Sequence, residues 1–337
     1  MPKRKRDPGG GALCTPFGEG VLNQACPIHK CEVSQDTSQG LTRLHFQKLD
    51  MTVVIKTVAV NGGNDGRIHK ATADCAQQTG IGIVKVRPVK EAPHHIADRP
   101  EGLDVHTEVY MHRVLSCLEK FAPELLLVGV DGDNNIYICM EGMEVTLHQF
   151  IYDNRRSDTQ GYPGEVFGIQ QIAVVLIAFF EKLKTCQTKY SFVHGDLHGD
   201  NIMIKTGIGG DPFAVLIDFG HSCRAAVGDK IAPCPYPVVD DHDTRLLLLD
   251  SLLPNKENDH IGPDLWMWFL EEIEIELDES IINADFMIRH LKKLLDDDYL
   301  SFLQEKHRDT DTDADTDTDA DTDTDTDTGT ARLSQFF

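Results

Sequence analysis

The most informative part of the sequence is VHGDLHGDNIMIK, from Val193 to Lys205, followed by LIDFG, from Leu216 to Gly220. Asp196 and Asn201 fall on a turn that ends in a short apolar run, and Asp218 directly follows a second apolar run. Short apolar runs between polar turns predict buried strands. Two adjacent strand ends would direct these three side chains into one cleft.

Carboxylate and amide side chains at this spacing suit the transfer of a phosphoryl group. Asp196 would lie beside the attacking hydroxyl, while Asn201 and Asp218 would hold Mg²⁺ on the nucleotide phosphates. Mg²⁺ is a hard cation that binds oxygen ligands and keeps much of its water. Either short motif alone would be a weak signal. Their order and their apolar flanks make the prediction specific.

A phosphate-covering turn is expected upstream, and the sequence from Val58 to Val86 offers one. It reads as an apolar strand, a Gly-rich turn, a second strand, a polar turn and a third apolar strand. Gly63 and Gly66 fit the second and third glycines of such a turn, where a missing Cβ lets the backbone approach phosphates. Asn61 stands where the first glycine would be. We expect the nucleotide to contact both glycines and Ile68 on the second strand.

Lys85 lies on the third strand and is our choice for the lysine that binds the α and β phosphates. Lys56 is the alternative candidate for this role, but it precedes the Gly-rich turn instead of following it. A lysine in this role needs a carboxylate on the next helix. Apolar residues at helical spacing between Leu103 and Phe121 predict that helix, and Glu108 lies beside them, whereas Glu101 falls in a polar linker.

Two further apolar runs, over residues 125–130 and 136–140, predict a pair of strands joined by a turn rich in Asp, Asn and Gly. The chain then reaches Met140, Glu141 and Met143, where we expect adenine to lie. An ordinary strand end is the alternative at this point.

Together these motifs resemble those of the protein-kinase-like superfamily over residues 51–303. The resemblance implies an α+β fold of two lobes, with a five-stranded sheet and one helix above a mainly helical lobe. It implies ATP and Mg²⁺ as cofactors. Asp196 would orient or deprotonate the acceptor hydroxyl, Asn201 and Asp218 would bind Mg²⁺, and Lys85 would pair with Glu108. The HGDLHGDN loop most resembles that of divergent kinases of large DNA viruses of eukaryotes.

Three departures from the family pattern bear on regulation and substrate. Gly195 replaces the arginine of His-Arg-Asp, whose pairing with a phosphate is the usual reason for activation by phosphorylation, so we expect a constitutively active enzyme. His198 replaces the lysine of serine/threonine protein kinases, as in some kinases of small molecules. It can give the γ-phosphate one hydrogen bond when neutral and a charge when protonated. No Ala-Pro-Glu motif follows Gly220, so the platform that docks a substrate peptide would be reduced.

We therefore expect a serine/threonine protein kinase of viral type, and we keep two alternatives. A small-molecule kinase of the aminoglycoside or choline kinase type is favoured by HGDLH and by the short segment after Gly220. A catalytically dead kinase fold acting as a scaffold is opposed by the retention of the lysine, both aspartates and the asparagine.

Asp243 opens an apolar helix, where the resemblance implies a bond to the catalytic-loop backbone; a simple N-cap is a compatible interpretation.

Length and composition are those of one globular domain with tails. The chain has 337 residues, of which 41% are hydrophobic, enough for a sizeable core. We expect an irregular extension over residues 1–40, an N-terminal lobe over 41–140, a C-terminal lobe over 141–305 and a disordered tail over 306–337. An Asp-Thr/Ala repeat in the tail holds ten aspartates and cannot bury apolar surface.

The acidic composition limits the partners that the chain can have. The tail repeat accounts for less than half of the formal net charge of −23, so the rest of the chain is acidic as well. Direct binding of nucleic acid, which relies on Lys and Arg, is not expected. The longest apolar run, Ile172 to Phe180 inside Val166 to Leu183, fits a buried helix before the catalytic loop. Its nine apolar residues are far below the ~20 that span a bilayer, and no apolar signal region follows Met1, so no membrane partner is expected. Nine cysteines in such a chain are expected to be thiols.

Both ends of the chain carry short motifs. The basic cluster Lys3–Arg6 resembles a nuclear localisation signal, which favours the nucleus over the cytoplasm of a host cell; a chance basic tail is the alternative. At the other end, Leu333, Phe336 and Phe337 are spaced as in peptides that bind a sliding clamp (PCNA), with Thr330 where glutamine is usual. A tail that folds back on its own domain is the alternative there.

Overall fold

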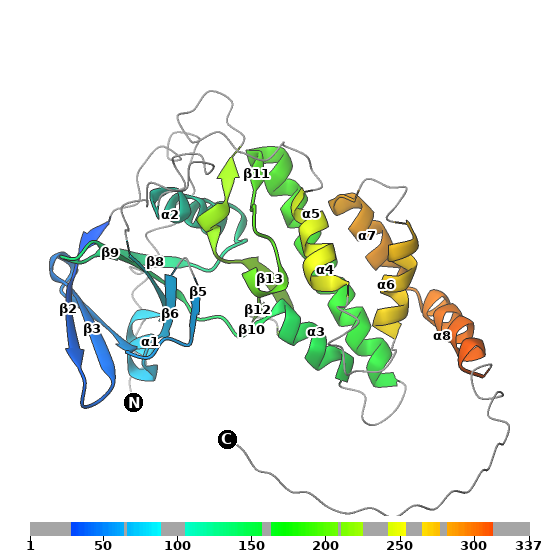
Figure 1. Cartoon of the computed structure of the whole chain (residues 1–337), viewed down its shortest axis with the longest axis horizontal. Coiled ribbons are helices and arrows are strands. Elements are labelled where there is room, and N and C mark those ends of the chain that lie inside the picture. The colour runs from blue at the N-terminus through cyan, green and yellow to red at the C-terminus, as the bar shows by residue number, and fades with distance from the viewer. Residues whose placement is uncertain are drawn as a thin grey trace, which may run out of the picture.

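The computed structural model of the chain describes residues 28–63, 66–88, 105–156, 163–207, 210–224, 242–253, 265–276 and 282–312. A sheet-rich N-terminal lobe and a mainly helical C-terminal lobe lie side by side along the long axis of the molecule (Figure 1). The two lobes are joined by the short segment between Glu141 and Val145. The α+β, two-lobed fold that the sequence motifs predict is therefore confirmed.

The N-terminal lobe is built on a six-stranded sheet in the order β1-β8-β9-β7-β6-β5, whose pairs are antiparallel except for β1 with β8. A second sheet, β2-β3-β4, shares its core. Phe46 lies so close to Gly129 of β8 that a Cβ there would come within 2.4 Å of the ring. The elements are β1 (His29–Lys30), β2 (Glu32–Asp36), β3 (Leu41–Phe46), β4 (Met51–Lys56), β5 (Asn61–Gly63), β6 (Gly66–Lys70), α1 (Ala73–Thr79), β7 (Ile81–Pro88), α2 (Val105–Val114), β8 (Leu125–Val130) and β9 (Asn135–Glu141).

This lobe is larger than the five strands implied by the resemblance. The antiparallel part supplies those five strands, but β1 and β2 lie within residues 1–40, where the sequence predicts an irregular extension. That prediction is wrong from His29 onward. The reason is that β2 is exposed and mostly polar, so it has no alternating apolar pattern to reveal it. Its pairing with β3 is instead fixed by a turn in which Asp36 Oδ1 accepts hydrogen bonds from the amides of Ser38 and Gln39.

The connection between β6 and β7 is a helix, α1, and the predicted polar turn is wrong there. Thr72 caps the helix through its side chain, which accepts from the Cys75 amide at 3.4 Å. Gly80 ends it in the left-handed conformation, with φ of +75°, which glycine adopts without strain. Cys75 is the buried residue on its inner face. A seven-residue helix with one buried side chain has too little periodicity to be recognised.

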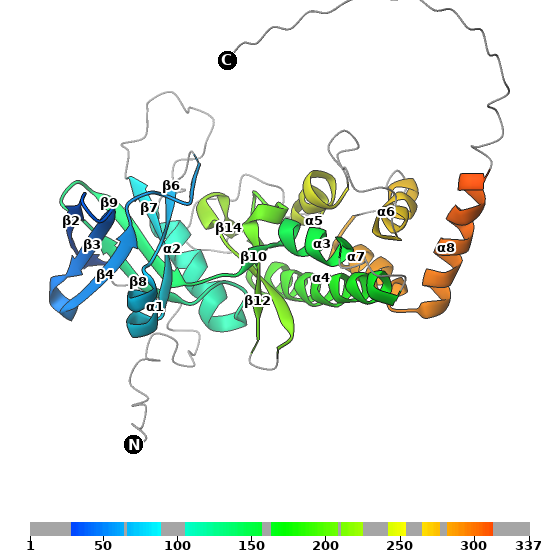
Figure 2. The same cartoon turned by 90° about the horizontal axis from the view of Figure 1, so that it is seen from below.

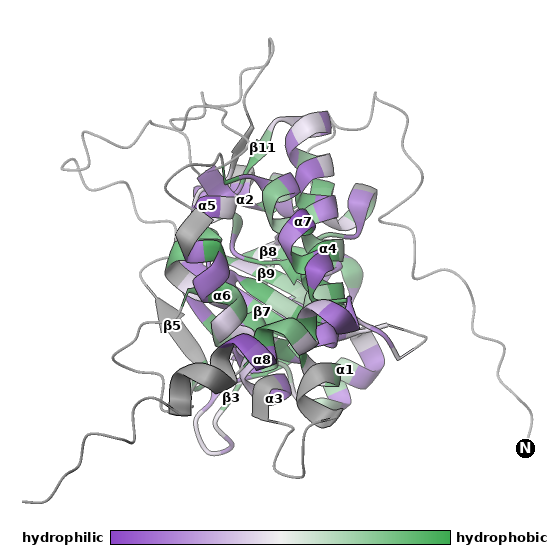
Figure 3. Ribbon diagram, turned by 90° about the vertical axis from the view of Figure 1, so that its right-hand side faces the viewer, coloured by the Kyte–Doolittle hydropathy of each residue, from purple (hydrophilic) through white to green (hydrophobic). Residues whose placement is uncertain are grey.

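The helix α4 forms the centre of the C-terminal lobe and includes the apolar run predicted as a buried helix. It contacts α3, α6, α7 and β13, and the side view shows it running along the lobe (Figure 2). Figure 3, which looks from the helical end, shows hydrophilic residues on the helices in front and the mainly apolar strands β7 to β9 of the N-terminal lobe behind them. The elements are β10 (Val145–Thr146), α3 (Leu147–Arg156), α4 (Pro163–Tyr190), β11 (Phe192–Val193), β12 (Ile202–Thr206), β13 (Pro212–Leu216), β14 (Cys223–Arg224), α5 (His242–Leu247), α6 (Leu265–Glu276), α7 (Ala284–Lys293) and α8 (Asp297–Thr312).

The helix α8 lies against α6 at the far end of this lobe (Figure 2). It continues to Thr312, so the tail predicted to be disordered from residue 306 is helical over its first residues. Leu300 and Leu303 are buried and fix the helix to the lobe, which explains why it extends past the predicted boundary. The remainder of the repeat, the clamp-like peptide and the N-terminal basic cluster lie outside the described residues. No helix in the described ranges is long and apolar enough to cross a membrane.

The cysteines only partly follow the expectation of thiols. Cys31, Cys75, Cys139 and Cys186 are free and buried. Cys117, in the π-helical segment Leu115–Glu119 that follows α2, is disulfide-bonded, so the expectation is wrong at this residue. Disulfide connectivity cannot be deduced from the spacing of cysteines, so no sequence pattern indicated this bond.

Candidate active site

The catalytic loop follows β11 and presents Asp196 to solvent. Gly195 adopts φ of +80°, a left-handed conformation that glycine accepts without a Cβ clash. The Asp196 side chain is about half exposed, at 48%. Asn201 Nδ2 lies 2.9 Å from Asp196 O, 3.4 Å from Asp196 Oδ2 and 2.9 Å from His198 Nε2. The loop therefore brings together the three polar residues that the sequence predicts for it.

The loop is anchored from below by Asp243 on α5. This side chain is fully buried, and its two carboxylate oxygens accept from the amides of His194 at 2.8 Å and Gly195 at 3.0 Å. The interaction predicted for Asp243 is present. His194 is also buried, and its Nε2 lies 3.0 Å from the carbonyl oxygen of Ile217. Burial lowers the pKa of His194, so the neutral ring holds the catalytic loop against the strand that leads to Asp218.

Asp218 follows β13 in the left-handed conformation, with φ of +59°. Its position is fixed because the Ile217 amide donates to Asn201 O at 3.0 Å. Among the described residues, Asp218 Oδ1 receives the hydrogen bonds of Lys85 and Gly220, which leaves Oδ2 free. Asn201 and Asp218 thus offer oxygen atoms as metal ligands from adjacent strand ends. The Asp218 side chain is 32% exposed. This donor set fits Mg²⁺, which prefers oxygen ligands and retains water.

Lys85 lies at the centre of a buried charge network. Its Nζ is 2.7 Å from Glu108 Oε1 on α2 and 2.6 Å from Asp218 Oδ1. Burial alone would lower the pKa of Lys85, but the two carboxylates outweigh it and raise the pKa, so the ammonium stays charged. Burial likewise opposes ionisation of Asp218, and Lys85 overcomes it, so the pKa of Asp218 is lowered. The rival Lys56 is exposed at the end of β4.

The Gly-rich hairpin covers Lys85. Gly63 of β5 pairs with Gly66 of β6, and Ile68 is the register partner of Lys85. A Cβ on Gly66 would fall 2.9 Å from Val86 O and 3.4 Å from Lys85 Cε, at a φ of +152° that other residues rarely adopt. A side chain at Gly66 would therefore displace the lysine or the strand that carries it.

The predicted adenine-binding residues have different environments. Met140 is 7% exposed and packs in the apolar cluster between α2 and the sheet. The Glu141 side chain pairs with Lys205 of β12 and accepts from the Glu124 amide at 2.8 Å. The Glu141 and Met143 side chains are partly exposed. The close approach of Gly82 to Gly142, where a Cβ on Gly82 would lie 2.4 Å from Gly142 Cα, holds this segment against β7.

Two residues of this region were not predicted from sequence. His112 on α2 packs on Phe219 with ring centroids 5.3 Å apart, and His194 packs on the same ring at 5.7 Å. Arg87 of β7 pairs with Glu108 Oε2. Arg87 follows Lys85 by two residues on a strand, a spacing that places both side chains on one face of the sheet. This spacing could have identified Arg87 as a site residue from the sequence. No comparable signal identifies His112.

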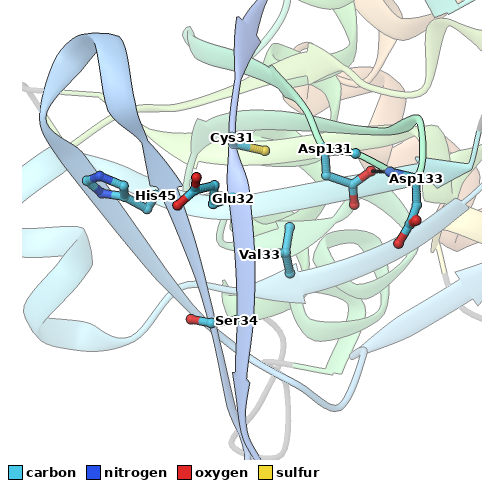
Figure 4. Close-up of a pocket in the computed structure, with 8 residues that line it drawn as sticks. Cys31, Glu32, Val33, Ser34, His45, Asp131 and Asp133 are labelled. Atoms are coloured by element: carbon cyan, nitrogen blue, oxygen red, sulfur yellow. Dashed lines mark hydrogen bonds between the residues drawn. The ribbon is translucent and has the colours of Figure 1, made fainter.

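A cavity of about 490 Å³ lies elsewhere, at the edge of the N-terminal lobe (Figure 4). It is lined by residues before and in β2, by one residue of β3 and by the turn between β8 and β9: Cys31, Glu32, Val33, Ser34, His45, Asp131, Gly132 and Asp133 (Figure 4). The Asp131 carboxylate is already occupied, because it accepts from the amides of Asp133 and Asn135. The turn that lines this cavity joins the end of β9 opposite Glu141, and none of the predicted site residues lines it. This cavity is therefore separate from the kinase-like site.

Comparison with known families bears on the C-terminal half of the site. Residues 151–228, which include the catalytic loop and Asp218, match the model of the phosphotransferase enzyme family (APH). The match indicates a kinase-like phosphotransferase. It covers a minor part of the chain and does not distinguish a protein acceptor from a small molecule. No curated protein matches the chain in sequence.

Proposed function

We propose that this protein is an active, Mg·ATP-dependent kinase that transfers the γ-phosphoryl group of ATP to a hydroxyl group. The observation that carries the proposal is the convergence of Lys85, Glu108 and Asp218 in one network beside Asp196 and Asn201. These residues come from β7, α2, the catalytic loop after β11 and the two ends of the β12–β13 hairpin. An inactive scaffold would not need this arrangement of charges.

Each side chain has a role that follows from its position. Asp196 is exposed and accepts a proton from, or orients, the incoming hydroxyl. Lys85, held forward by Glu108, binds the α and β phosphates. Asn201 and Asp218 would hold Mg²⁺, which neutralises charge on the phosphates when it is bound. Because Asn201 Nδ2 lies against Nε2 of His198, the Nδ1–H group of neutral His198 is the one left to donate to a phosphate oxygen.

For the acceptor, we propose a serine or threonine hydroxyl of a protein. The exposure of Asp196, together with the predicted nuclear signal and clamp-like tail, supports a macromolecular acceptor in the nucleus of a host cell. A small alcohol, as in the aminoglycoside and choline kinases, is the second candidate. The family match over residues 151–228 and the HGDLH loop favour it.

One experiment tests the reaction and separates the acceptors. The full chain is incubated with γ-labelled ATP and Mg²⁺, once with a denatured protein extract and once with a metabolite extract, beside the Asp196→Asn variant. Label on serine or threonine of proteins supports the first acceptor, and label in low-mass products supports the second. Labelling by the variant at the wild-type level, or none by the wild type, would contradict the proposed reaction.

A further inference from the structure

Arg87 forms a second ion pair with Glu108 that the kinase-like motifs do not include. Its guanidinium Nη1 contacts Glu108 Oε2, while Lys85 Nζ contacts Oε1 at 2.7 Å. Each oxygen of this carboxylate therefore has its own cation. The side chain of Glu108 is 3% exposed and that of Arg87 is 16% exposed, so the pair is shielded from solvent.

The second cation balances the charge of the network. Lys85 alone would face two carboxylates, those of Glu108 and Asp218. Lys85 has to share its charge with the phosphates, and a buried carboxylate with too little positive charge beside it is strongly unfavourable unless another cation remains. Arg87 remains, because its contact does not involve the oxygen that Lys85 uses. The guanidinium also offers a planar set of donors that suits a carboxylate better than an ammonium does.

Arg87 also reaches the segment that carries Asp218. A Cβ built on Gly220 would lie 3.3 Å from Arg87 Nη1, so the guanidinium packs directly against this glycine. One side chain therefore touches α2 through Glu108 and the turn after Asp218 through Gly220. Both segments must be in place for Lys85 and Asp218 to act together.

We propose that Arg87 is a positioning residue that holds Glu108, and with it α2, in the active position before nucleotide binds. This inference rests on the proposed function, in which Lys85 stays paired with Glu108 while it binds the phosphates. It also gives a physical basis for activity without phosphorylation, because the chain supplies the cation that keeps the active arrangement assembled.

Hydrogen exchange of the α2 amides tests the inference without any turnover. We compare the nucleotide-free full chain with its Lys85→Met, Arg87→Met and doubly substituted variants, and use Arg43→Met, an exposed arginine of β3, as the control. We expect α2 to keep its protection in Lys85→Met and in the control, to lose part of it in Arg87→Met and to lose most in the double variant. Faster exchange in Lys85→Met with no change in Arg87→Met would overturn the inference, as would equal exchange in all proteins.

Kinetics provide the second measurement. If α2 is assembled in only part of the Arg87→Met molecules, the apparent KM for ATP rises by the inverse of that fraction, about tenfold for 10% assembly, while kcat at saturating ATP changes little. Arg87→Lys should recover part of the loss, because it keeps the charge. A fall in kcat with unchanged KM would contradict a positioning role. Absence of turnover in the wild type would refute the proposed function alone, since the exchange measurement would still decide the role of Arg87.

Discussion

At the scale of single residues, Asp196 and Asp218 should fail in different ways. Asp196→Asn removes the carboxylate beside the hydroxyl but little of the nucleotide contact, so kcat should fall by about 10²–10⁴-fold while ATP still binds. Asp218→Ala should instead abolish Mg²⁺-dependent nucleotide binding. Turnover assays and calorimetric titration with ATP, with and without Mg²⁺, separate the two effects. Near-wild-type turnover by Asp196→Asn would mean that the catalytic loop is assigned wrongly.

His112 should make stability depend on pH. Burial lowers its pKa from 6.5 to about 4, opposed by the hydrogen bond to Pro123 O and by the charge of Glu108. The unfolded chain therefore binds a proton that the folded chain rejects, and the stabilisation present above pH 6.5 is lost as the pH falls toward 4. The loss amounts to about 3 kcal/mol for a shift of this size. His194, whose pKa is also lowered by burial, should add to the slope.

The measurement is urea unfolding at several pH values between 7 and 4 for the wild type and for His112→Leu. The difference in free energy of unfolding between the two proteins removes the contribution of the carboxylates that both share. We expect the wild type to lose more stability than the variant over this range. Parallel curves would show that His112 is protonated as readily in the folded protein as in the unfolded one.

At the scale of elements, the location of the nucleotide site in the N-terminal lobe depends on which strand carries the phosphate-binding lysine. Lys85 on β7 is buried in the charge network, whereas Lys56 is exposed at the end of β4. Lys85→Met should therefore lower kcat/KM by at least about 10²-fold, since it removes a charged donor from the phosphates. Lys56→Met should have a small effect. The opposite order of the two variants would move the nucleotide site upstream along the chain.

The sequence predicted those elements whose residues interact with near neighbours in the chain. The catalytic loop, the strands β8 and β9 and the helix α4 each have a local pattern, and all were expected at nearly the observed positions. By contrast, α1 has one buried side chain and β2 is polar, so neither has a periodic signal. The roles of Arg87 and His112 depend on how α2 is rotated against β7. Such tertiary contacts cannot be read from one sequence.

At the scale of the whole molecule, activity should not require prior phosphorylation. Gly195 stands where the phosphate-reading arginine would be, and the Lys85–Glu108 pair is already formed in the chain as it is. Enzyme treated with phosphatase should therefore retain the activity of untreated enzyme. A large loss on treatment would show that another cationic residue reads a phosphate, and constitutive activity would have to be abandoned.

The C-terminal peptide should bind a eukaryotic-type sliding clamp weakly. Thr330 lacks the contacts of glutamine, but Leu333, Phe336 and Phe337 can bury apolar surface, worth ~1.5–3 kcal/mol for each fully buried large side chain before ordering costs. The Asp-Thr repeat, whose charges repel one another, would extend and give the peptide reach. Calorimetry compares the peptide of residues 329–337 with its double alanine variant at Phe336 and Phe337. Equal heats from both, or none, would rule out a clamp partner.

Contacts between the C-terminal lobe and the hinge, the segment of residues 141–145 that joins the lobes, determine how the two lobes can move apart. Glu141 pairs with Lys205, and Glu144 accepts from the amide and the hydroxyl of Thr206. The hinge is thus braced on both sides of Gly142. A rigid-body rotation of the lobes would break the ion pair between Glu141 of β9 and Lys205 of β12, whereas lifting the β5–β6 hairpin would leave it intact. We therefore expect the β5–β6 hairpin to lift when ADP leaves. The rate of product release would then depend on this motion and not on separation of the lobes.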